Sequence, residues 1–537
     1  MLSRRTFLQS LAAFPLAAKT LSRRPNIVLM MADDMGFSDL GCYGSEIRTH
    51  NIDALAKAGL RFNQFYNTAR CCPTRASLLT GLYPHQAGVG HMVDTGKESL
   101  PGYRGDLSAN CVTIAQVLRS AGYRTMMAGK WHITPVTPSK NNWPMQRGFE
   151  RFYGTIHGAG SFYDPVTLTL GNEPVKPEGA DYYYTDAIAQ HAENFLGELG
   201  AGADPFFLYV AFTSPHWPMH APETDIAKYK GRYHQGWDVL RAQRHKKMIE
   251  LGVVEKRWPL TERDVKAPSW EAEPHKEWME RRMEVYAAMV DRMDQAVGRI
   301  VAKLKALNKL DNTLILFLSD NGGCAEELNG AGNAWHVPKQ TLDGRPVRFG
   351  NKPEVMPGKD DTYQSYGLPW ANASNTPFRL YKHWVHEGGI STPLIAHWPK
   401  GITKRKGSFV SEPSHLIDIM ATCVDLGQAK YPATAVNNAI IPMEGRSLGP
   451  LLKGGKTAVS RIICWEHEGN RAIREGDWKL VSKFPGEWEL YNLRVDRTEQ
   501  KNLAGMEPAK VKSLTAKWNE WAQRAFVKPW DEVRAAK

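Results

Sequence analysis

The sequence predicts a protein of the α/β class, with a large parallel sheet covered by helices and a smaller C-terminal domain. Three observations support this prediction. Apolar runs of strand length alternate with helical segments through roughly the first 430 residues. Four of these runs lead directly into polar residues. Beyond about residue 430, short strands follow one another at close spacing, which is typical of an antiparallel sheet.

The apolar runs are the strands on which the prediction depends, and they cover residues 26–31, 124–128, 206–212 and 313–318. They are almost continuously hydrophobic and lack the alternation of polar and apolar residues that marks a half-exposed strand. Continuous apolar runs are typical of central strands in a parallel sheet, because helices cover both faces of such a sheet.

Helical segments between these runs provide that cover. We expect them at residues 52–59, 76–82, 113–121, 182–196 and 277–307. Alternating strands and helices build an open sheet, and such sheets bind ligands beyond the carboxyl ends of their strands. The functional site is therefore expected at that edge.

The C-terminal part has a different pattern. Short strands are expected at 462–466, 471–474, 478–481 and 488–493, separated by Gly-Asn, Gly-Asp and Pro-Gly pairs. These pairs favour tight turns, so the strands should pair in an antiparallel meander. A helix from about 509 to 524 follows. We predict a main domain at 24–430 and a C-terminal subdomain at 431–537.

The N-terminus has the features of a targeting segment. Arg4 and Arg5 precede an apolar run at 8–18, and Ala17 and Ala18 provide small residues for cleavage. The run is too short to span a bilayer. A chance pair of arginines is the alternative, but the position at the very start favours a twin-arginine signal peptide at 1–23. We therefore expect the twin-arginine export machinery as a partner, and a periplasmic or secreted bacterial protein.

Composition and charge narrow the class of protein. The net charge is +12, yet the basic residues are dispersed and form no nucleic-acid-binding motif, so we expect no nucleic-acid partner. A basic balance suits anionic substrates. No later segment is a candidate membrane span, which argues against an integral membrane protein. The seven cysteines are scattered and do not form a disulfide framework.

Polar residues follow each of the four predicted central strands. Because the carboxyl ends of parallel strands meet at one edge of a sheet, these side chains should lie close together. The residues are Asp33 and Asp34 after the first run, Lys130 and His132 after the second, His216 after the third, and Asp320 and Asn321 after the fourth.

Four of these residues are candidate metal ligands. Asp33, Asp34, Asp320 and Asn321 offer only oxygen, the donor that hard cations prefer. We expect Ca²⁺, with Mg²⁺ as the alternative. A strand end followed by a helix-capping turn would also explain either Asp33 or Asp34 alone.

The segment Cys71-Cys72-Pro73-Thr74-Arg75 carries the clearest chemical signal. Proline is favoured in a first helical turn, so Cys71 should lie at the start of a helix. A helix N-terminus presents free N–H groups and a partial positive charge, and it therefore attracts anions. A nucleophile at this position would face an anionic substrate.

The order of motifs along the chain resembles that of the sulfatase family. Asp-Asp-Met-Gly, Cys-x-Pro-x-Arg, Gly-Lys-Trp-His, Ser-Pro-His, Ser-Asp-Asn-Gly and Lys-x-x-x-x-Glu-Gly-Gly follow one another between about residues 25 and 503. The sequence is most similar to bacterial arylsulfatases. The resemblance implies the alkaline phosphatase-like fold: a large, mixed, mostly parallel sheet sandwiched by helices, with a smaller C-terminal α+β domain on an antiparallel sheet.

The resemblance also implies a modified nucleophile. In formylglycine-dependent type I sulfatases the first cysteine of the signature is oxidised by a formylglycine-generating enzyme, and here that residue would be Cys71. The formylglycine would join Asp33, Asp34, Asp320 and Asn321 as a ligand of the cation. An oxygen function at position 71 would match that set better than sulfur, which prefers soft metals.

The other catalytic roles carry over one by one. Arg75 and Lys130 would stabilise the ionised hydrate of formylglycine, and His132 would later remove its proton to expel sulfate. His216 and Lys382 would hold the sulfate group, with His216 as the proton donor to the leaving oxygen. Metal and cations offset charge on the transferring group, and histidines exchange protons near neutral pH.

The implied reaction is hydrolysis of a sulfate monoester, either an aryl sulfate or a sulfated carbohydrate, through a formylglycine–sulfate intermediate. Two alternatives remain open at this point. A phosphonate or phosphate ester hydrolase could use the same scaffold, although its simplest relatives use serine or threonine with two metals. A non-catalytic protein could bind sulfated glycans, but this chain keeps the full set of catalytic residues. Residues 163–164, 228–275 and 326–374 are the expected rim of the pocket.

Overall fold

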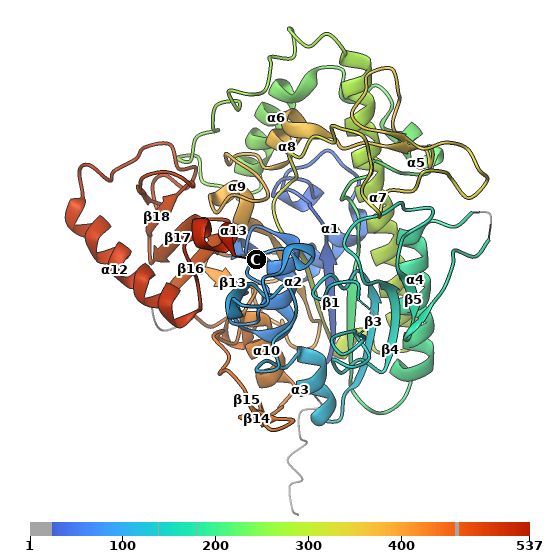
Figure 1. The fold of residues 1–537 in the computed structure, drawn as a ribbon, viewed down its shortest axis with the longest axis vertical. Coiled ribbons are helices and arrows are strands. Elements are labelled where there is room, and N and C mark those ends of the chain that lie inside the picture. Colours follow the sequence, from blue (N-terminus) through green and yellow to red (C-terminus); the bar gives the residue numbers. More distant parts are fainter. Residues whose placement is uncertain (1–23, 138, 180, 457–460, 537) are drawn as a thin grey trace, which may run out of the picture.

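The computed structural model describes residues 24–137, 139–179, 181–456 and 461–536. The predicted signal peptide at 1–23 lies outside the described residues. A large twisted sheet runs through the molecule, with helices on both faces and a smaller sheet beside it (Figure 1). The predicted α/β class and architecture are confirmed.

The four predicted strands lie side by side at the centre of the large sheet. The first, β1 (Asn26–Ala32), pairs in parallel with β7 (Phe206–Ala211) on one side and with β8 (Thr313–Ser319) on the other. Beyond β7, the strands β3 (Arg124–Gly129) and β4 (Arg151–Thr155) continue the parallel order. Their carboxyl ends therefore meet at one edge.

Antiparallel strands complete both edges and make the sheet mixed. On one side, β11 (Ser391–His397) runs antiparallel to β8 and to β2 (Leu60–Tyr66). The short strands β12 (Phe409–Val410) and β13 (Ser414–His415) then pair with β2. On the other side, β5 (Leu168–Leu170) and β6 (Glu173–Pro174) follow β4.

The two faces of β1 explain its continuous hydrophobic sequence. Val28 and Met30 belong to one hydrophobic core, whereas Ile27 and Leu29 belong to the other. The first core contains side chains of α1 (His50–Ala58), α4 (Tyr184–Phe195) and α7 (Lys276–Ala306), and the second those of α2 (Cys71–Thr80), α3 (Ile114–Ser120) and α10 (Asp418–Leu426).

The remaining elements lie in the connections. Two helices at one end of the molecule, α6 (Gly236–Glu250) and α8 (Gly367–Ser374), contact each other (Figure 1). The short elements are α5 (Glu223–Ile226), α9 (Glu387–Ile390), α11 (Gly449–Leu452), α13 (Trp530–Ala535), β9 (Arg348–Phe349), β10 (Thr362–Tyr363), β14 (Thr434–Ala435) and β15 (Asn438–Ala439).

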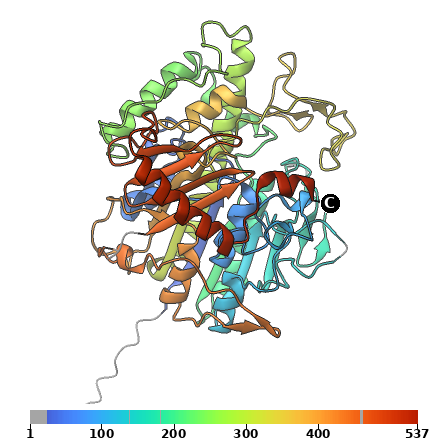
Figure 2. The same cartoon turned by 60° about the vertical axis from the view of Figure 1, so that its left-hand side comes forward.

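The C-terminal sheet is the predicted antiparallel meander. Its strands are β16 (Ile462–His467), β17 (Asn470–Glu475), β18 (Trp478–Ser482) and β19 (Glu489–Asn492). The helix α12 (Pro508–Arg524) lies across this sheet (Figure 2). The predicted boundary near residue 430 stays a prediction.

A buried ionic cluster joins the small sheet to the large domain. Lys479 Nζ on β18 lies 3.0 Å from Glu387 Oε1 and 2.7 Å from Glu499 Oε1. Arg497 Nε lies 3.2 Å from Glu387 Oε2. All four side chains are inaccessible to solvent, so each charge depends on its partners for compensation.

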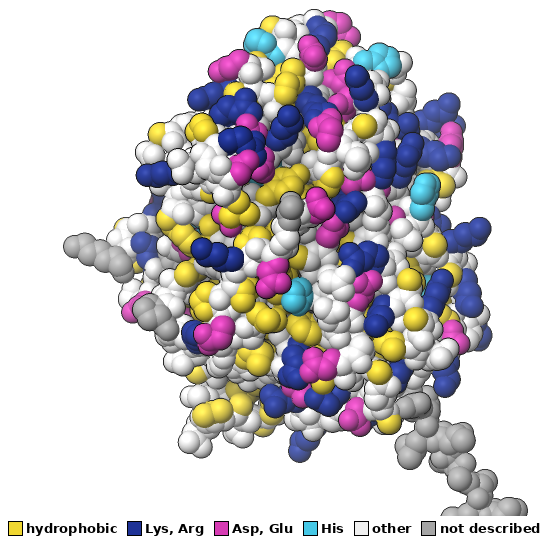
Figure 3. All heavy atoms as spheres, turned by 90° about the vertical axis from the view of Figure 1, so that its right-hand side faces the viewer, with side chains coloured by type: hydrophobic (Ala, Val, Ile, Leu, Met, Phe, Trp, Pro, Cys, Tyr) yellow, Lys and Arg dark blue, Asp and Glu magenta, His cyan; other side chains and the backbone are white. Residues whose placement is uncertain are grey.

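The outer surface carries charges of both signs. On the face drawn in Figure 3, basic side chains are dispersed among acidic ones, as the sequence indicated. Among the described residues, no helix combines the length and the apolar character needed to cross a membrane.

Candidate active site

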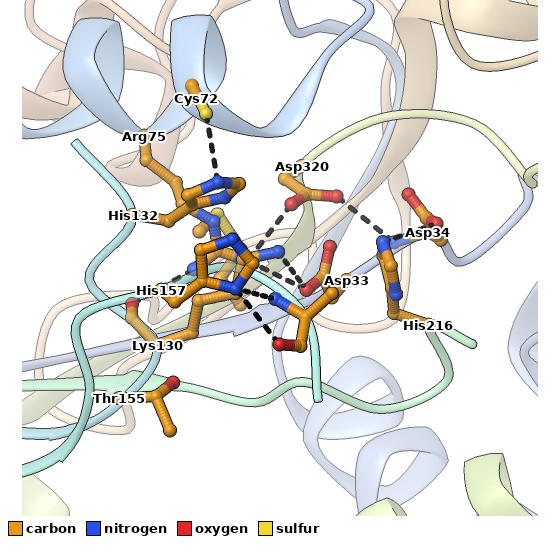
Figure 4. A network of polar contacts seen from close by, with 12 residues as sticks. Asp33, Asp34, Cys72, Arg75, Lys130, His132, Thr155, His157, His216 and Asp320 are labelled. Carbon is orange, nitrogen blue, oxygen red and sulfur yellow. Dashed lines mark hydrogen bonds and ion pairs between the residues drawn. The ribbon is translucent and has the colours of Figure 1, made fainter. Parts of the chain in front are cut away.

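The predicted site residues meet at the carboxyl edge of the central strands (Figure 4). Asp33 and Asp34 follow β1, His216 follows β7, and Asp320 follows β8. Lys130 follows β3, whose pairing with β7 carries it to the same edge. The topology of parallel strands therefore brings together residues that are far apart in the chain.

The helix α2 brings the signature cysteine to this edge. It begins at Cys71 itself, after Arg70 in an extended conformation, and so starts five residues before the predicted segment at 76–82. Pro73 lies in the first turn, where its missing N–H leaves no hydrogen bond unmade. Cys71 is 2% exposed, and its thiol interacts with Cys72, with Lys130 and with His132.

Acids and bases alternate in the centre of the site. Lys130 Nζ lies 2.6 Å from Asp33 Oδ2, and Arg75 Nη2 lies 2.9 Å from Asp320 Oδ2 and 3.4 Å from Asp33 Oδ2. Burial alone would raise the pKa of Asp33, but Lys130, His216 and Arg75 hold it below its usual range. Burial and the neighbouring charge of Asp33 raise the pKa of Asp320 well above its ordinary value.

Lys382 and His216 form the second half of the site. Lys382 Nζ lies 2.9 Å from Asp34 Oδ2 and 3.4 Å from His216 Nε2. His216 Nδ1 lies 2.6 Å from the carbonyl oxygen of Trp217, which can only accept a hydrogen bond. Nδ1 therefore carries the proton, and the free Nε2 faces Lys382 and Asp34.

His132 lies on the opposite side, close to the start of α2. Its Nε2 is 3.3 Å from Cys72 Sγ, and its backbone has a φ of +55°, a left-handed conformation that is costly for such a residue. Burial lowers the pKa of His132 to about 4. The ring lies against the backbone of Gly158, where a Cβ atom would come within 2.0 Å of it.

The oxygen atoms of the site fit a hard cation. Asp33 Oδ1 and Asn321 Oδ1 are buried and have no hydrogen-bond partner. Asn321 Nδ2 donates to Asp34 Oδ1 at 2.7 Å, which holds the Asn321 amide beside the Asp34 carboxylate. Carboxylate and amide oxygens without other partners are the ligands that Ca²⁺ and Mg²⁺ prefer.

The charges of the site favour an anionic ligand. Three buried carboxylates, those of Asp33, Asp34 and Asp320, face the three cationic groups of Arg75, Lys130 and Lys382. A divalent cation held by the acids would leave the site with net positive charge, which attracts an anion.

The structure thus brings together every residue that the sequence placed in the site, and the chemical roles assigned to these residues remain predictions. The set comprises Asp33, Asp34, Cys71, Arg75, Lys130, His132, His216, Asp320, Asn321 and Lys382.

Several neighbouring residues were not predicted as site residues. Glu326 Oε1 lies 2.7 Å from Arg70 Nη1, and Trp217 Nε1 donates to Glu326 Oε2 at 2.9 Å. His157 Nε2 lies 3.2 Å from Asp94 Oδ2. No spacing pattern marks these residues, because their contacts join separate loops. Glu326 does begin the segment that was expected at the rim.

Aromatic rings line the approach to His132. The His157 ring lies 5.8 Å from that of His132, 4.7 Å from that of His336 and 4.6 Å from that of Trp335. Trp335 is 59% exposed. His336 and Trp335 belong to the segment 326–374, so this part of the expected rim does reach the neighbourhood of the site.

Comparisons with known proteins agree with this site. The family model described as Sulfatase matches residues 25–429, and the model described as N-sulphoglucosamine sulphohydrolase, C-terminal, matches residues 378–524. An uncharacterized sulfatase of Schizosaccharomyces pombe is 33% identical over 93% of each chain. An arylsulfatase of Klebsiella aerogenes is 32% identical over 80% of this chain and 92% of its own.

Solved structures share the fold. The structure of Ps i-CgsB in complex with k-i-k-neocarrahexaose is 25% identical, with a TM-score of 0.66 over 93% of both chains. The phosphonate monoester hydrolase of Agrobacterium radiobacter, at 21% identity, has a TM-score of 0.57 over 94% of this chain and 96% of its own. The latter likeness is one of fold alone.

Fold and site together are typical of a hydrolase that acts on an anionic ester, because buried cations and acids surround the start of α2 at the edge of a mostly parallel sheet. The chain belongs to the sulfatase family. It is accordingly a sulfuric ester hydrolase.

Proposed function

We propose that this sulfatase hydrolyses a sulfate monoester of a phenol or a carbohydrate with residue 71, converted from cysteine to formylglycine, as its nucleophile. The observation that carries the proposal is the position of Cys71. It opens α2 in a Cys-x-Pro-x-Arg sequence, and its side chain interacts with Lys130 and His132. A hydrated formylglycine would supply an oxygen nucleophile there.

Calcium is the cation that we propose, with magnesium as the alternative. Asp33, Asp34, Asp320, Asn321 and residue 71 would hold it. The bound cation would act as a Lewis acid on a sulfate oxygen and lower the pKa of an oxygen nucleophile. The unpartnered oxygen atoms of Asp33 and Asn321 support this assignment.

The cationic side chains of Arg75 and Lys130 orient the nucleophile and the sulfate group. Arg75 is fixed by Asp320 and by the carbonyl oxygen of Lys130, to which its Nη1 donates at 3.1 Å. Lys130 is fixed by Asp33. Both cations are therefore preorganised beside residue 71, where they stabilise negative charge without further rearrangement.

Two histidines move protons on opposite sides of the site. In the neutral form, His132 accepts a proton from a hydroxyl group at residue 71. His216 carries its proton on Nδ1, so its Nε2 binds the second proton and then delivers it to the leaving oxygen. Lys382 Nζ, 3.4 Å from that Nε2, holds the sulfate group and limits the charge on His216.

The substrate that we propose is an aryl sulfate or a sulfated carbohydrate. An arylsulfatase and an N-acetylglucosamine-6-O-sulfatase are among the relatives, at 32% and 26% identity. A neocarrahexaose is bound in the 25% identical structure. The rings of His157, Trp335 and His336 provide a face on which an aromatic or sugar ring can stack.

Maturation and export are part of the proposal. A formylglycine-generating enzyme would modify Cys71, and the twin-arginine machinery would export the protein to the periplasm or the medium. The Arg4-Arg5 pair and the apolar run that follows support this route.

Mass spectrometry of the tryptic peptide 71–75 tests the nucleophile, because Arg70 and Arg75 bracket it. The full chain is produced with and without a formylglycine-generating enzyme. We expect an aldehyde at residue 71 and sulfatase activity only in the first preparation. A free thiol in an active preparation would contradict the proposal.

Matched substrates separate the alternative functions. Sulfate, phosphate and phosphonate esters of the same phenol are compared with the modified protein. We expect the sulfate ester to have the highest kcat/KM. A preference for phosphate or phosphonate would indicate the other hydrolase, and binding of a sulfated polymer without sulfate release would indicate a binding protein.

A further inference from the structure

A second cluster of metal-binding side chains lies at the junction between the large domain and the C-terminal sheet. His467 is the last residue of β16, and Glu468 follows it in the turn before β17. This turn meets His91, which follows α2, and His383, which follows Lys382. Of the described residues, His91, His467 and Glu468 form one of three groups whose donor atoms lie within 4.8 Å of one another.

The distances in this cluster match a shared metal ion. His91 Nδ1 lies 3.3 Å from Glu468 Oε1, and His467 Nε2 lies 3.4 Å from the same oxygen. Ligands at about 2.0–2.1 Å from a tetrahedral zinc ion are roughly 3.3 Å apart. Both distances to Glu468 Oε1 therefore match the spacing of two ligands on one ion, and all three donor atoms lie within 4.8 Å of one another.

The histidines have ring nitrogens that make no hydrogen bond, although two of them lie near Glu468 Oε1. His467 is completely buried, and neither of its ring nitrogens makes a hydrogen bond. The Nδ1 atom of His91 also makes none. Buried polar atoms are nearly always hydrogen-bonded in folded proteins, so these nitrogens indicate a ligand between them.

The carboxylate is held in place from its other side. Asn470 Nδ2 donates to the carbonyl oxygen of His467 at 2.9 Å, and Asn470 Oδ1 accepts from Phe484 N at 3.0 Å, which fixes the amide orientation. The same Nδ2 lies 3.2 Å from His383 Nε2, so His383 carries its proton on Nδ1. That Nδ1 lies 3.1 Å from Glu468 Oε2 and orients the carboxylate.

We propose that His91, His467 and Glu468 bind a divalent transition metal, and that His383 positions the carboxylate by a hydrogen bond to its second oxygen. Two imidazoles and one carboxylate suit Zn²⁺ and leave a coordination position open for water. Hydrogen-bonded carboxylates of this kind are a usual feature around metal ligands. The donor set differs from the all-oxygen set of Asp33, Asp34, Asp320 and Asn321.

The bound metal would join two parts of the fold. His91 belongs to the connection after α2, whereas His467 and Glu468 belong to the C-terminal sheet. His383 has a φ of +89° and donates its backbone N–H to the carbonyl oxygen of Ala69 at 2.8 Å. The ion would thus fix the C-terminal hairpin against the loop that carries Lys382. The nearby Arg70 is neutralised by Glu326.

Metal analysis of the full chain tests this proposal. The protein is treated with a chelator, loaded with Zn²⁺ alone, and freed of excess metal before the bound zinc is measured by mass spectrometry. We expect about one zinc per chain in the wild type. The variants His91→Phe and Glu468→Gln should lose it. Cys71→Ser and Asp320→Asn should keep it, because they alter the cysteine group at the start of α2 and the proposed calcium site.

Cobalt substitution provides a second readout. Co²⁺ in the proposed site should give visible d–d absorption without a thiolate charge-transfer band, since no cysteine is a ligand. Zn²⁺ should raise the Tm of the wild type but not that of Glu468→Gln. Circular dichroism without metal shows whether each variant is folded, and Glu468→Gln keeps the size of the side chain.

Two results would overturn the proposal. One is a wild-type protein that retains no zinc after loading. The other is zinc that disappears in Cys71→Ser but persists in folded Glu468→Gln, which would place the ion at Cys71, Cys72 and His132. All of these measurements are independent of sulfatase activity.

Discussion

The ammonium group of Lys382 lies 2.9 Å from Oδ2 of Asp34, although 348 residues separate the two in the chain. The same nitrogen faces His216 Nε2. One lysine therefore contacts both a proposed metal ligand and the proposed proton donor, so its removal should affect catalysis strongly.

Lys382→Met should lower kcat/KM for an aryl sulfate by about a hundredfold or more, the usual cost of removing a preorganised charge partner. The expected cause is the loss of the cation that we propose to hold the sulfate group beside His216. Steady-state kinetics measure the effect, with Lys404→Met, a change at an exposed lysine, as the control. Wild-type kinetics in Lys382→Met would contradict this role.

Removal of the proposed calcium ion should lower both activity and stability. When a chelator removes the cation, the buried carboxylates of Asp33, Asp34 and Asp320 repel one another without its compensating charge. Calcium at a hundred times its Kd should then stabilise the folded protein by about 2.7 kcal/mol, measured as a rise in Tm.

The matching variants for this prediction are Asp320→Asn and Asp343→Asn. The first should lose the calcium-dependent rise in Tm, whereas the second, in an exposed loop, should keep it. A rise of equal size in both variants would place the calcium ion elsewhere.

Gly158→Ala should damage catalysis by displacing His132. The added Cβ atom would lie within 2.0 Å of the His132 ring, so the ring must move. A displacement of about 1 Å can cost a hundredfold in rate, and we expect a loss of kcat of that order. Gly160→Ala is the control two residues away, since its nearest neighbour is Val166 at 3.3 Å. Equal rates in the two variants would refute the argument.

Lys479→Met should destabilise the protein by roughly 3–5 kcal/mol, because it leaves Glu387 and Glu499 buried with too little compensating charge. Urea denaturation gives the change in free energy of unfolding. Lys517→Met breaks an ion pair with Glu475 whose partners are 38% and 37% exposed, and it should cost about 1 kcal/mol or less. Similar losses in both variants would mean that burial of the cluster is unimportant.

Much of the fold was predictable because its central strands are continuously apolar. Two strands beyond β8, β11 and β2, were not predicted. The sequence of β11 is interrupted by Pro393, and its pairing with β2 changes register between Thr392 and Leu394. Polar residues interrupt β2 itself, so neither strand shows a clear period.

The helix α6 was not predicted for a different physical reason. Its buried face includes Arg244, whose Nη1 lies 2.6 Å from Asp39 Oδ1 and whose Nε lies 2.9 Å from Glu46 Oε2. Hydrophobic periodicity cannot reveal a helix that is held by buried charges.

The site was predictable to the extent that strand ends and motifs mark it. Asp33 and Asp320 follow apolar runs, and parallel topology requires their carboxyl ends to meet. Glu326 contacts Arg70, and Glu468 contacts His91. Each contact joins two loops that are far apart in the sequence. Such contacts depend on tertiary packing and leave no pattern in a single sequence.

His220 should make the stability of this protein depend on pH. It is completely buried, its Nε2 donates to the carbonyl oxygen of Thr362 at 2.6 Å, and its Nδ1 accepts from Phe162 N at 3.4 Å. Both ring nitrogens are thus satisfied in the neutral form, and burial lowers the pKa of His220 from 6.5 to about 4. The unfolded chain therefore binds a proton more readily than the folded one between these values. The resulting stability is fully present above pH 6.5 and is lost as the pH falls toward 4, by about 3 kcal/mol.

Urea denaturation at pH 7 and pH 4 measures the loss. His220→Gln should be less sensitive to pH by that amount, because glutamine can donate to Thr362 but does not titrate, whereas His50→Gln, at an exposed histidine, should behave as the wild type does. An unchanged pH dependence in His220→Gln would show that other groups control acid unfolding.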